Sequence, residues 1–345
     1  MKKNLIRAVV IVFAIALGLF IVKKSLPGKY MTVAGFTQGT TYHITYQSKK
    51  GEDLQNDIDS LLARFDQSLS AYIPGSIISQ INRNEPDVKL DTFFTDVFRK
   101  SYEVYKATDG AFDITVGPIV DALGFGPTKG VNVDSSLIDS LMLYVGMDKV
   151  KIVNGSVVKK YKETLLDVNA LAQGYSVDVV CHFFDNKHIR NYLVEIGGEV
   201  RGKGKNKSGE LWRVGVDKPI ENNQIPGADL QAIIELNNQA LATSGNYRKF
   251  YVKNGIKYTH TINPRTGYPV LKTVLSASVV ANDCITADAY ATAFMVMGFK
   301  KAKAFLAIHP ELDAYLIIGT ENGKYNIFVT KNLKKYIEEE SLTVD

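Results

Sequence analysis

The sequence is that of an α+β protein, in which mixed, largely antiparallel sheets pack against helices. Three observations point to this class. Segments with the two-residue alternation of strands are mixed with segments of helical spacing. They follow no regular strand-helix-strand period, as a doubly wound parallel sheet would require. Asn-Gly pairs at 254–255 and 322–323 mark hairpin turns between strands.

The N-terminal part of the body combines strand and helix signals. Apolar and polar side chains alternate over residues 30–46, so we expect a strand that is interrupted at Gln38-Gly39. Apolar residues at helical spacing predict a helix over 54–69 and a second helix over 92–108.

The C-terminal part contains short strands, helices and a last hairpin. The expected ranges are, in chain order, strands at 193–196, 212–216 and 232–236, a hairpin over 250–262, helices at 286–297 and 300–307, and a hairpin of 314–318 with 326–329. No internal repeat or low-complexity linker divides the body. Residues 30–345 are therefore expected to form a single unit.

The composition excludes several classes of protein. Of the 345 residues, 46% are hydrophobic and 22% are charged, which is unlike a fibrous or mainly disordered protein. Residues 1–29 hold six basic residues and no acidic one, so the net charge falls from +5 for the chain to −1 for the remainder. The body therefore lacks the excess of basic residues that is typical of a nucleic-acid-binding protein. Cys181 and Cys284 are too few for a disulfide framework, and we expect two buried thiols.

An apolar run near the N-terminus predicts a membrane anchor. Residues 8–22 are apolar or glycine without interruption, with basic residues on both sides, as in an export signal. Such a helix spans about 22 Å of a hydrocarbon core of about 30 Å, and flanking lysines extend its reach. We expect residues 1–29 to be an uncleaved signal anchor in the inner (cytoplasmic) membrane. The denser positive charge before the run places the body on the periplasmic, extracytoplasmic side. A cleaved signal peptide and a buried soluble helix are the alternatives.

Asp288 and Thr292 are the first candidate functional pair. They lie four residues apart in an alanine-rich stretch, so a helix would place a carboxylate and a hydroxyl on one face. Hard oxygen ligands near a helix N-terminus suit Mg²⁺ with a bound phosphate. The alternative is an acidic residue favoured by the helix dipole and a threonine that bonds to its own backbone.

Two further segments place polar residues at the ends of elements. A strand ending at Asp167 is expected to run into a helix that starts near Ala172, and the turn between them exposes backbone groups to a ligand or a metal. His260 precedes a rigid turn formed by Asn263-Pro264. Taken alone, the first segment is more typical of an ordinary strand-to-helix junction than of a ligand site, and the histidine is more typical of a structural residue than of a catalyst.

Taken together and in order, these segments resemble the FAD:protein FMN transferase family, also called ApbE proteins. The likeness runs from about residue 36 to residue 298. The motifs that carry it are Gly39-Thr40-Thr41-Tyr42, Tyr72 to Asn82, Gly110 to Asp113 with Gly117-Pro118, Leu166 to Tyr175, Gly197-Gly198, Ala242 to Gly245, His260 to Gly267, and Ala287 to Ala289 with Thr292. Eight such motifs in the family order are improbable by chance. The resemblance implies a T-fold-related single catalytic unit over 30–345.

The activity that the resemblance implies is Mg²⁺-dependent transfer of FMN. Such an enzyme splits FAD, attaches FMN through its phosphate to a threonine hydroxyl of a partner protein, and releases AMP. Resembling proteins modify subunits of sodium-pumping quinone reductases and Rnf-type complexes, so the implied partner is a redox-complex subunit. By the same likeness Asp288 and Thr292 give side-chain oxygens to Mg²⁺, and Ala170 gives a backbone carbonyl. The implied FAD site is lined by Gln38, Ala71, Tyr72, Ala111, Phe112, Asp113, Asp167, Gln173 and His260.

Two positions depart from the family pattern. Family members commonly have Lys where Gln173 stands and Met where Gln38 stands, which puts a cationic phosphate contact and the flavin or adenine packing in question. The base that takes the threonine proton is not assigned, with His260 and Asp283 as the candidates. The alternatives to transfer are a metal-dependent FAD pyrophosphatase, a non-catalytic flavin-binding protein, and a membrane-anchored scaffold.

Overall fold

The computed structural model describes most of the chain after its N-terminal segment. The described residues are 28–128, 130–131, 133–219, 227–246, 250–253, 256–259, 261–270, 274–320 and 324–339. The expected signal anchor at 1–29 lies outside them, apart from its last two residues. None of the helices in these ranges combines the length and the apolar character that crossing a membrane requires.

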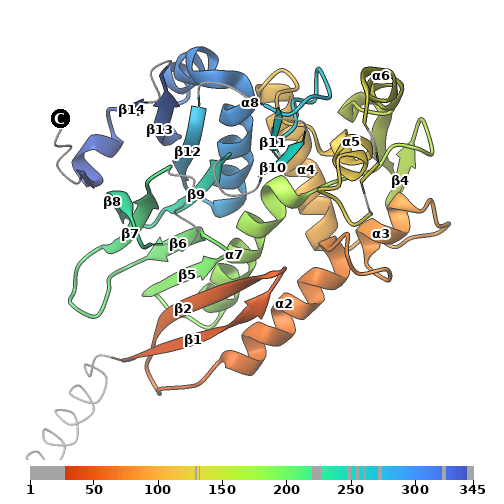
Figure 1. The fold of residues 1–345 in the computed structure, drawn as a ribbon. Helices are drawn as coiled ribbons and strands as arrows, with labels where there is room; N and C mark the ends of the chain where they lie inside the picture. The colour runs from red at the N-terminus through yellow and green to blue at the C-terminus, as the bar shows by residue number, and fades with distance from the viewer. Residues whose placement is uncertain are drawn as a thin grey trace, which may run out of the picture.

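An eight-stranded sheet forms the centre of the molecule (Figure 1). Its strand order is β1-β2-β5-β6-β9-β12-β13-β14, and every neighbouring pair is antiparallel. The strands are β1 Lys29–Thr37, β2 Thr40–Ser48, β5 Tyr192–Ile196, β6 Glu199–Lys203, β9 Ala240–Gly245, β12 Val274–Ala281, β13 Asp313–Gly319 and β14 Tyr325–Val329. The expected α+β class with largely antiparallel pairing is confirmed.

Three smaller sheets accompany the central one. A three-stranded sheet has the order β15-β8-β7, and two hairpins pair β3 with β4 and β10 with β11. Their strands are β3 Val150–Val153, β4 Ser156–Lys159, β7 Trp212–Asp217, β8 Leu230–Leu236, β10 Phe250–Lys253, β11 Ile256–Thr259 and β15 Ile337–Glu339. The expected hairpin at 250–262 is confirmed for its two strands, whereas its turn at 254–255 lies outside the described residues.

Along the chain, most of the described helices come after β2 and before β5, which is the next strand of the central sheet. The α-helices are α2 Gln55–Leu69, α3 Ile77–Asn82, α4 Thr92–Ala107, α5 Gly117–Ala122, α6 Ser135–Met142, α7 Asn169–Asn186 and α8 Cys284–Ile308. Short 3₁₀ turns are η1 Ile114–Val116, η2 Met147–Lys149 and η3 Leu333–Tyr336. The helices expected over 54–69 and 92–108 are thus present, within a residue at each end.

The two faces of the central sheet bury two different cores, because side chains of a strand point alternately to either side. In β13, Ala314 and Leu316 belong to the core shared with the helices. Tyr315 and Ile317 belong to a second core shared with β7, β8 and η3. Helices α7 and α8 therefore cover one face of the sheet, and the sheet β15-β8-β7 covers the other (Figure 1).

Helix α8 is broken where the sequence predicts two helices. Gly298, between the expected helices at 286–297 and 300–307, has a φ of 71° inside α8. An L-residue with a side chain rarely adopts this left-handed conformation, which glycine takes without a steric penalty. The glycine therefore turns the second half of α8 away from the first.

The prediction of a strand that ends at Asp167 is wrong. Residues 164–168 form no strand, and α7 begins at Asn169 rather than near Ala172. The Asn82 side chain instead bonds both backbone groups of Leu166, with its amide nitrogen 2.9 Å from the carbonyl and its oxygen 2.8 Å from the N–H. The N–H of Asp167 donates to the carbonyl of Ile114 at 2.7 Å. The Asn82 side chain and this carbonyl supply bonds that a neighbouring strand would make, so the segment joins no sheet.

Candidate active site

Helices α7 and α8 pack against each other (Figure 1), and their backbones come close at Gly174. A Cβ at this position would lie 2.5 Å from the carbonyl oxygen of Cys284 and 2.7 Å from Cβ of Asp288. The backbone N–H of Gly174 donates to Oδ2 of Asp288 at 2.9 Å. The absence of a side chain at residue 174 thus brings α7 into hydrogen-bonding distance of the Asp288 carboxylate.

Asp288 is a buried carboxylate without a neutralising partner in the described ranges. It is 6% exposed, and its described contacts include no ion pair. Burial raises its pKa to about 7, an effect that the hydrogen bond from Gly174 partly offsets. A buried anion is unfavourable unless a proton or a cation compensates it. The site is therefore suited to a cation.

Thr292 lies one helical turn after Asp288 and faces β9. Its hydroxyl is 2.9 Å from the hydroxyl of Ser244. A hydroxyl has one donor and two acceptor positions, so Thr292 keeps a free lone pair if it donates to Ser244. The sequence prediction that Asp288 and Thr292 share one face of a helix is consistent with this geometry, while Ser244 was not singled out for a role.

The N-terminal turn of α7 carries Asp167 and Ala170. Oδ1 of Asp167 accepts a hydrogen bond from the N–H of Asn169 at 2.9 Å, which caps the helix from just outside it. Burial is the main cause that raises the pKa of Asp167, with a smaller contribution from Asp121. In a regular helix the N–H of Gly174 would bond the carbonyl of Ala170. The Asp288 carboxylate therefore competes with the Ala170 carbonyl for this N–H.

Gln38 reaches α7 at Ser176, three residues after Gln173. The Ser176 hydroxyl donates to the Gln173 carbonyl at 2.7 Å and lies 3.5 Å from Oε1 of Gln38. The amide nitrogen of Gln38 is buried and has no hydrogen-bond partner among the described residues. A side chain at Gly197 would overlap the Gln173 amide. Both residues that depart from the family pattern therefore lie on or beside α7.

The Gln38 side chain comes from the turn between β1 and β2. Gln38 and Gly39 have φ values of 51° and 74°, as in the two-residue turns that match the twist of antiparallel hairpins. Gly197, with a φ of 65°, stands in the corresponding turn after β5. Two hairpin turns at one end of the sheet thus flank the beginning of α7.

Tyr72 lies near the same end of the molecule, on the turn before α3. It is 60% exposed, and its hydroxyl is 3.5 Å from the carbonyl of Phe125. Partial burial of the hydroxyl, followed by the negative charges of Asp167 and Asp121, raises the pKa of Tyr72. The carbonyl of Ala71 is 3.3 Å from the Ser79 hydroxyl, which fixes the turn. Tyr72 therefore presents an exposed ring close to Asp167.

The residues Ala111, Phe112 and Asp113 are buried rather than open to a ligand through their side chains. Oδ1 of Asp113 accepts from the N–H and the hydroxyl of Thr115 at 2.8 and 2.5 Å, and Oδ2 accepts from the N–H of Met147 at 3.2 Å. The Asp113 carboxylate is thus committed to holding its own loop. Any contact of this segment with FAD would come from its backbone.

Of the two candidate bases, His260 and Asp283, the structure describes only Asp283. His260 lies outside the described residues. Asp283 is the N-cap of α8, and its Oδ1 accepts from the N–H of Thr286 at 3.0 Å. Capping occupies one oxygen of Asp283, and this structural role is enough to explain an aspartate at the start of α8.

The loop after His260 is held against the α5 and α6 region. The Arg265 guanidinium forms an ion pair with Asp109 at 2.7 Å and also donates to the Asp109 carbonyl. Gly267, with a φ of 72°, leaves no room for a Cβ beside Ile138 and Ile119. Residues 261–270 therefore bridge the third hydrophobic cluster, formed around α5 and α6, and the loop after α4.

No group of three or more His, Cys, Asp or Glu side chains in the described part of the chain gathers as a metal site. A cation beside Asp288 would therefore draw its other ligands from hydroxyl and carbonyl oxygens, water and a substrate phosphate. Mg²⁺ prefers such oxygen ligands and commonly uses only one or two carboxylates. The donor set at Asp288, Thr292 and Ala170 fits this ion.

A model of the ApbE family matches residues 38–316, which is most of the chain. The protein belongs to the ApbE family. The FAD:protein FMN transferase of Haemophilus influenzae is 33% identical over 335 residues, covering 93% of this chain and 94% of its own. That of Vibrio cholerae is 33% identical over 320 residues, covering 90% and 94%.

Solved structures of ApbE proteins share the fold. The flavin transferase ApbE from Vibrio cholerae superposes with a TM-score of 0.80 at 33% identity, covering 90% of this chain and 100% of that one. The ApbE protein from Thermotoga maritima gives 0.78 at 27% identity, covering 90% and 100%. The family resemblance expected from the motifs is confirmed.

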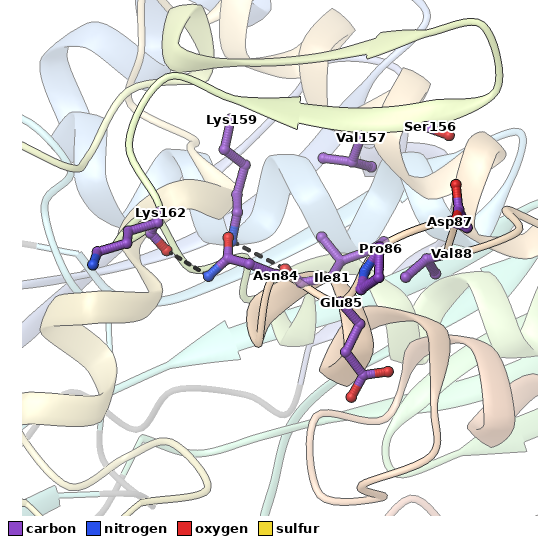
Figure 2. A pocket seen from close by; sticks show the side chains of 10 residues that line it. All are labelled: Ile81, Asn84, Glu85, Pro86, Asp87, Val88, Ser156, Val157, Lys159 and Lys162. Atoms are coloured by element: carbon purple, nitrogen blue, oxygen red, sulfur yellow. Dashed lines mark hydrogen bonds between the residues drawn. The ribbon is translucent and has the colours of Figure 1, made fainter.

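A cavity in this ApbE protein is lined by other residues than those described above. It encloses about 300 Å³ between the segment that follows α3 and the β3-β4 hairpin (Figure 2). The Lys159 ammonium donates to the carbonyls of Ile81 and Thr164 at 3.0 and 2.9 Å, and burial lowers its pKa to about 8. Lys159 is thus engaged in joining the hairpin to α3. None of the residues predicted to bind FAD or metal lines this cavity.

Two residues that sequence reasoning did not assign contribute to the site. Gly174 allows the approach of the helices, and Ser244 bonds Thr292. Both fall inside motifs of the family resemblance. Their separation from Asp288 and Thr292 by 114 and 48 positions hides the contacts from any local pattern.

Proposed function

We propose that this protein transfers FMN from FAD to a threonine hydroxyl of an acceptor protein, in the presence of Mg²⁺, and releases AMP. The observation that carries the proposal is the buried Asp288 carboxylate, which has no cationic partner in the described ranges and stands one turn before Thr292. The names of the curated relatives, FAD:protein FMN transferase, support the reaction class.

The reaction would form one phosphorus–oxygen bond and break another. The threonine oxygen attacks the phosphorus on the FMN side of the FAD diphosphate, the bond to the bridging oxygen breaks, and AMP leaves with that oxygen. The hydroxyl proton is lost to a base that the described residues do not identify. Bound Mg²⁺ supplies neutralisation of the charge that develops on the diphosphate oxygens.

Different residues of the chain would then bind the ion and FAD. Asp288 and Thr292 would offer side-chain oxygens to the ion and Ala170 a carbonyl, because the bond from Gly174 to Asp288 competes for the helix donor of that carbonyl. Gln173 and Gln38 would face the FAD from α7 and from the β1-β2 turn. Tyr72 would offer an exposed aromatic ring to a flavin or adenine ring.

The experiment that tests the proposal is labelling of an acceptor. The protein is incubated with FAD, Mg²⁺ and a candidate redox-complex subunit, and mass spectrometry then looks for an added FMN on a threonine peptide. The same acceptor with that threonine changed to valine is the control. Free FMN and AMP with no labelled acceptor would instead indicate a pyrophosphatase, and unaltered FAD would indicate a non-catalytic binder.

We propose further that residues 1–29 anchor the protein in the inner membrane with its body on the periplasmic side. The support is the apolar run at 8–22 with basic residues on both sides. Reporter fusions after Lys29 should report an extracytoplasmic location, and a chain starting at residue 30 should be soluble and active. A cytoplasmic reporter signal would contradict the proposed orientation.

A further inference from the structure

Asp178 is a buried carboxylate in the middle of α7 that the proposed reaction does not use. Its side chain is 2% exposed. Oδ1 accepts from the Arg201 guanidinium at 2.5 Å and from the N–H of Cys284 at 3.0 Å, and Oδ2 accepts from the N–H of Ile285 at 2.8 Å. Both oxygens are therefore occupied, and two of the three bonds reach α8.

These bonds complete the N-terminus of α8. The first N–H groups of a helix have no partner within it and carry the positive end of its dipole. Asp283 accounts for one of them, because its side chain accepts from the N–H of Thr286, while its carbonyl accepts the first regular helical bond, from Ala287. Asp178 accounts for the N–H groups of Cys284 and Ile285. A residue of α7 thus supplies part of the cap of α8.

The cap and the Asp288 contact form two ties between the same helices. Gly174 bonds Asp288, and four residues later Asp178 bonds Cys284, which lies four residues before Asp288. The ties are one helical turn, about 5.4 Å, apart along each helix. Helix α8 also packs against β9 and β12, and the two polar ties add directional bonds that specify its position along α7 and its rotation. The direction of the Asp288 carboxylate depends on both.

Arg201 extends this connection to the central sheet. It lies on β6 and pairs with Asp178 across the interface between β6 and α7. The turn that leads into β6 contains Gly197, which packs against Gln173. The sheet, α7 and α8 are therefore joined through one buried carboxylate.

We propose that Asp178, held by Arg201, is a positioning residue that sets the register of α8 on α7 and thereby aims the Asp288 carboxylate at its metal. The metal part of this statement rests on the proposed function. Asp178 touches neither the metal nor FAD and acts only through α8.

The test compares Asp178→Asn with a matched variant on the same helix. Asn keeps the shape but replaces one acceptor by an NH₂ group that cannot accept from an N–H, and it removes the charge that faces Arg201. Asp185→Asn is the control. Asp185 also lies on α7 and also pairs with a β6 cation, Lys203, at 2.8 Å, but no described bond joins it to α8.

Two measurements on the full chain, with FAD affinity as a control, separate positioning from a general loss of stability. Hydrogen exchange of residues 284–288 should become at least tenfold faster in Asp178→Asn and stay unchanged in Asp185→Asn. The dissociation constant for Mn²⁺, measured by electron paramagnetic resonance with Mn²⁺ replacing Mg²⁺, should rise at least tenfold in Asp178→Asn only. The affinity for FAD, measured by flavin fluorescence without metal, should stay within twofold in both variants.

The outcomes distinguish this proposal from the proposed function. Exchange and Mn²⁺ affinity in Asp178→Asn equal to those of Asp185→Asn would overturn the positioning role. A parent chain that binds Mn²⁺ but labels no acceptor would overturn the proposed function. Hydrogen exchange and Mn²⁺ affinity would still test the role of Asp178 in that case. If Asp178→Asn does not fold, Arg201→Lys replaces it, since lysine keeps the charge and loses the planar fork. Mn²⁺ binding at least threefold weaker is then expected, and unchanged binding would overturn the proposal.

Discussion

Gly174→Ala tests whether the contact between α7 and α8 is as close as the structure has it. The added methyl would lie 2.5 Å from the Cys284 carbonyl oxygen and 2.7 Å from Cβ of Asp288, and neither atom can rotate away. Relief requires the helices to separate, and overpacking of this kind costs about 1 to 3 kcal/mol. Separation also stretches the hydrogen bond from residue 174 to the carboxylate, and a bond to a charged group contributes about 1.5 to 3 kcal/mol. We expect the free energy of unfolding to fall by about 3 kcal/mol and FMN transfer to fall with it.

Urea unfolding, followed by circular dichroism, measures the stability of this variant, and acceptor labelling measures its activity. Gly75→Ala is the control, because a Cβ at residue 75 would meet no atom within 4 Å. The control should stay within about 0.5 kcal/mol of the parent, as exposed substitutions usually do. A Gly174→Ala variant that matched the Gly75→Ala variant in both stability and transfer would refute the close approach of the two helices.

Four further predictions concern the residues expected to bind the metal and FAD. Asp288→Asn should abolish most transfer and raise the Mg²⁺ requirement while FAD still binds, as shown by flavin fluorescence beside acceptor labelling. In the metal-free parent, burial raises the pKa of Asp288 to about 7, so the folded chain holds a proton that the unfolded chain loses above about pH 4. The free energy of unfolding should therefore fall from pH 4 to 7 by up to about 1.4 kcal/mol per pH unit, and urea titrations of Asp288→Asn should lack this slope. Thr292→Ala should lose less transfer than Asp288→Asn in the same assay, because water can replace a neutral hydroxyl ligand. Gln173→Lys should tighten FAD binding at low salt through a charge-assisted bond, and unchanged affinity at low and high salt would show that residue 173 faces away from the diphosphate.

Much of the fold can be predicted from local patterns in the sequence. Helices α2 and α4 follow from the spacing of their apolar residues, and the break in α8 follows from Gly298. The prediction of a strand before α7 is wrong, because the bonds of this segment come from the Asn82 side chain, 84 residues before Leu166, and from the carbonyl of Ile114. The hairpin β3-β4 and helix α6 were not predicted, since short elements with few buried residues carry little periodicity.

The candidate site, too, contains features that the sequence predicts and features that it does not. The i, i+4 spacing of Asp288 and Thr292 is visible in the sequence, and the structure gives both residues to one continuous part of α8. Their partners Gly174 and Ser244 come from α7 and β9, and only the packing of these elements brings them together. Asp178 carries no signal in the sequence at all, because its partners are backbone N–H groups, which every residue type but proline possesses.

The two sides of the site differ in how they are held, and this difference predicts how they act. Asp288 and Thr292 stand on a regular helix that is tied to α7 and to β9 by bonds of 2.9 Å. Gln38 and Tyr72 stand on turns, the first at a positive φ and the second largely exposed. Geometry that must be kept during a reaction is best supported by rigid elements, whereas recognition is commonly carried by loops. Substitutions at Gln38 or Tyr72 should therefore act on the KM for FAD, and substitutions on α8 should act on kcat.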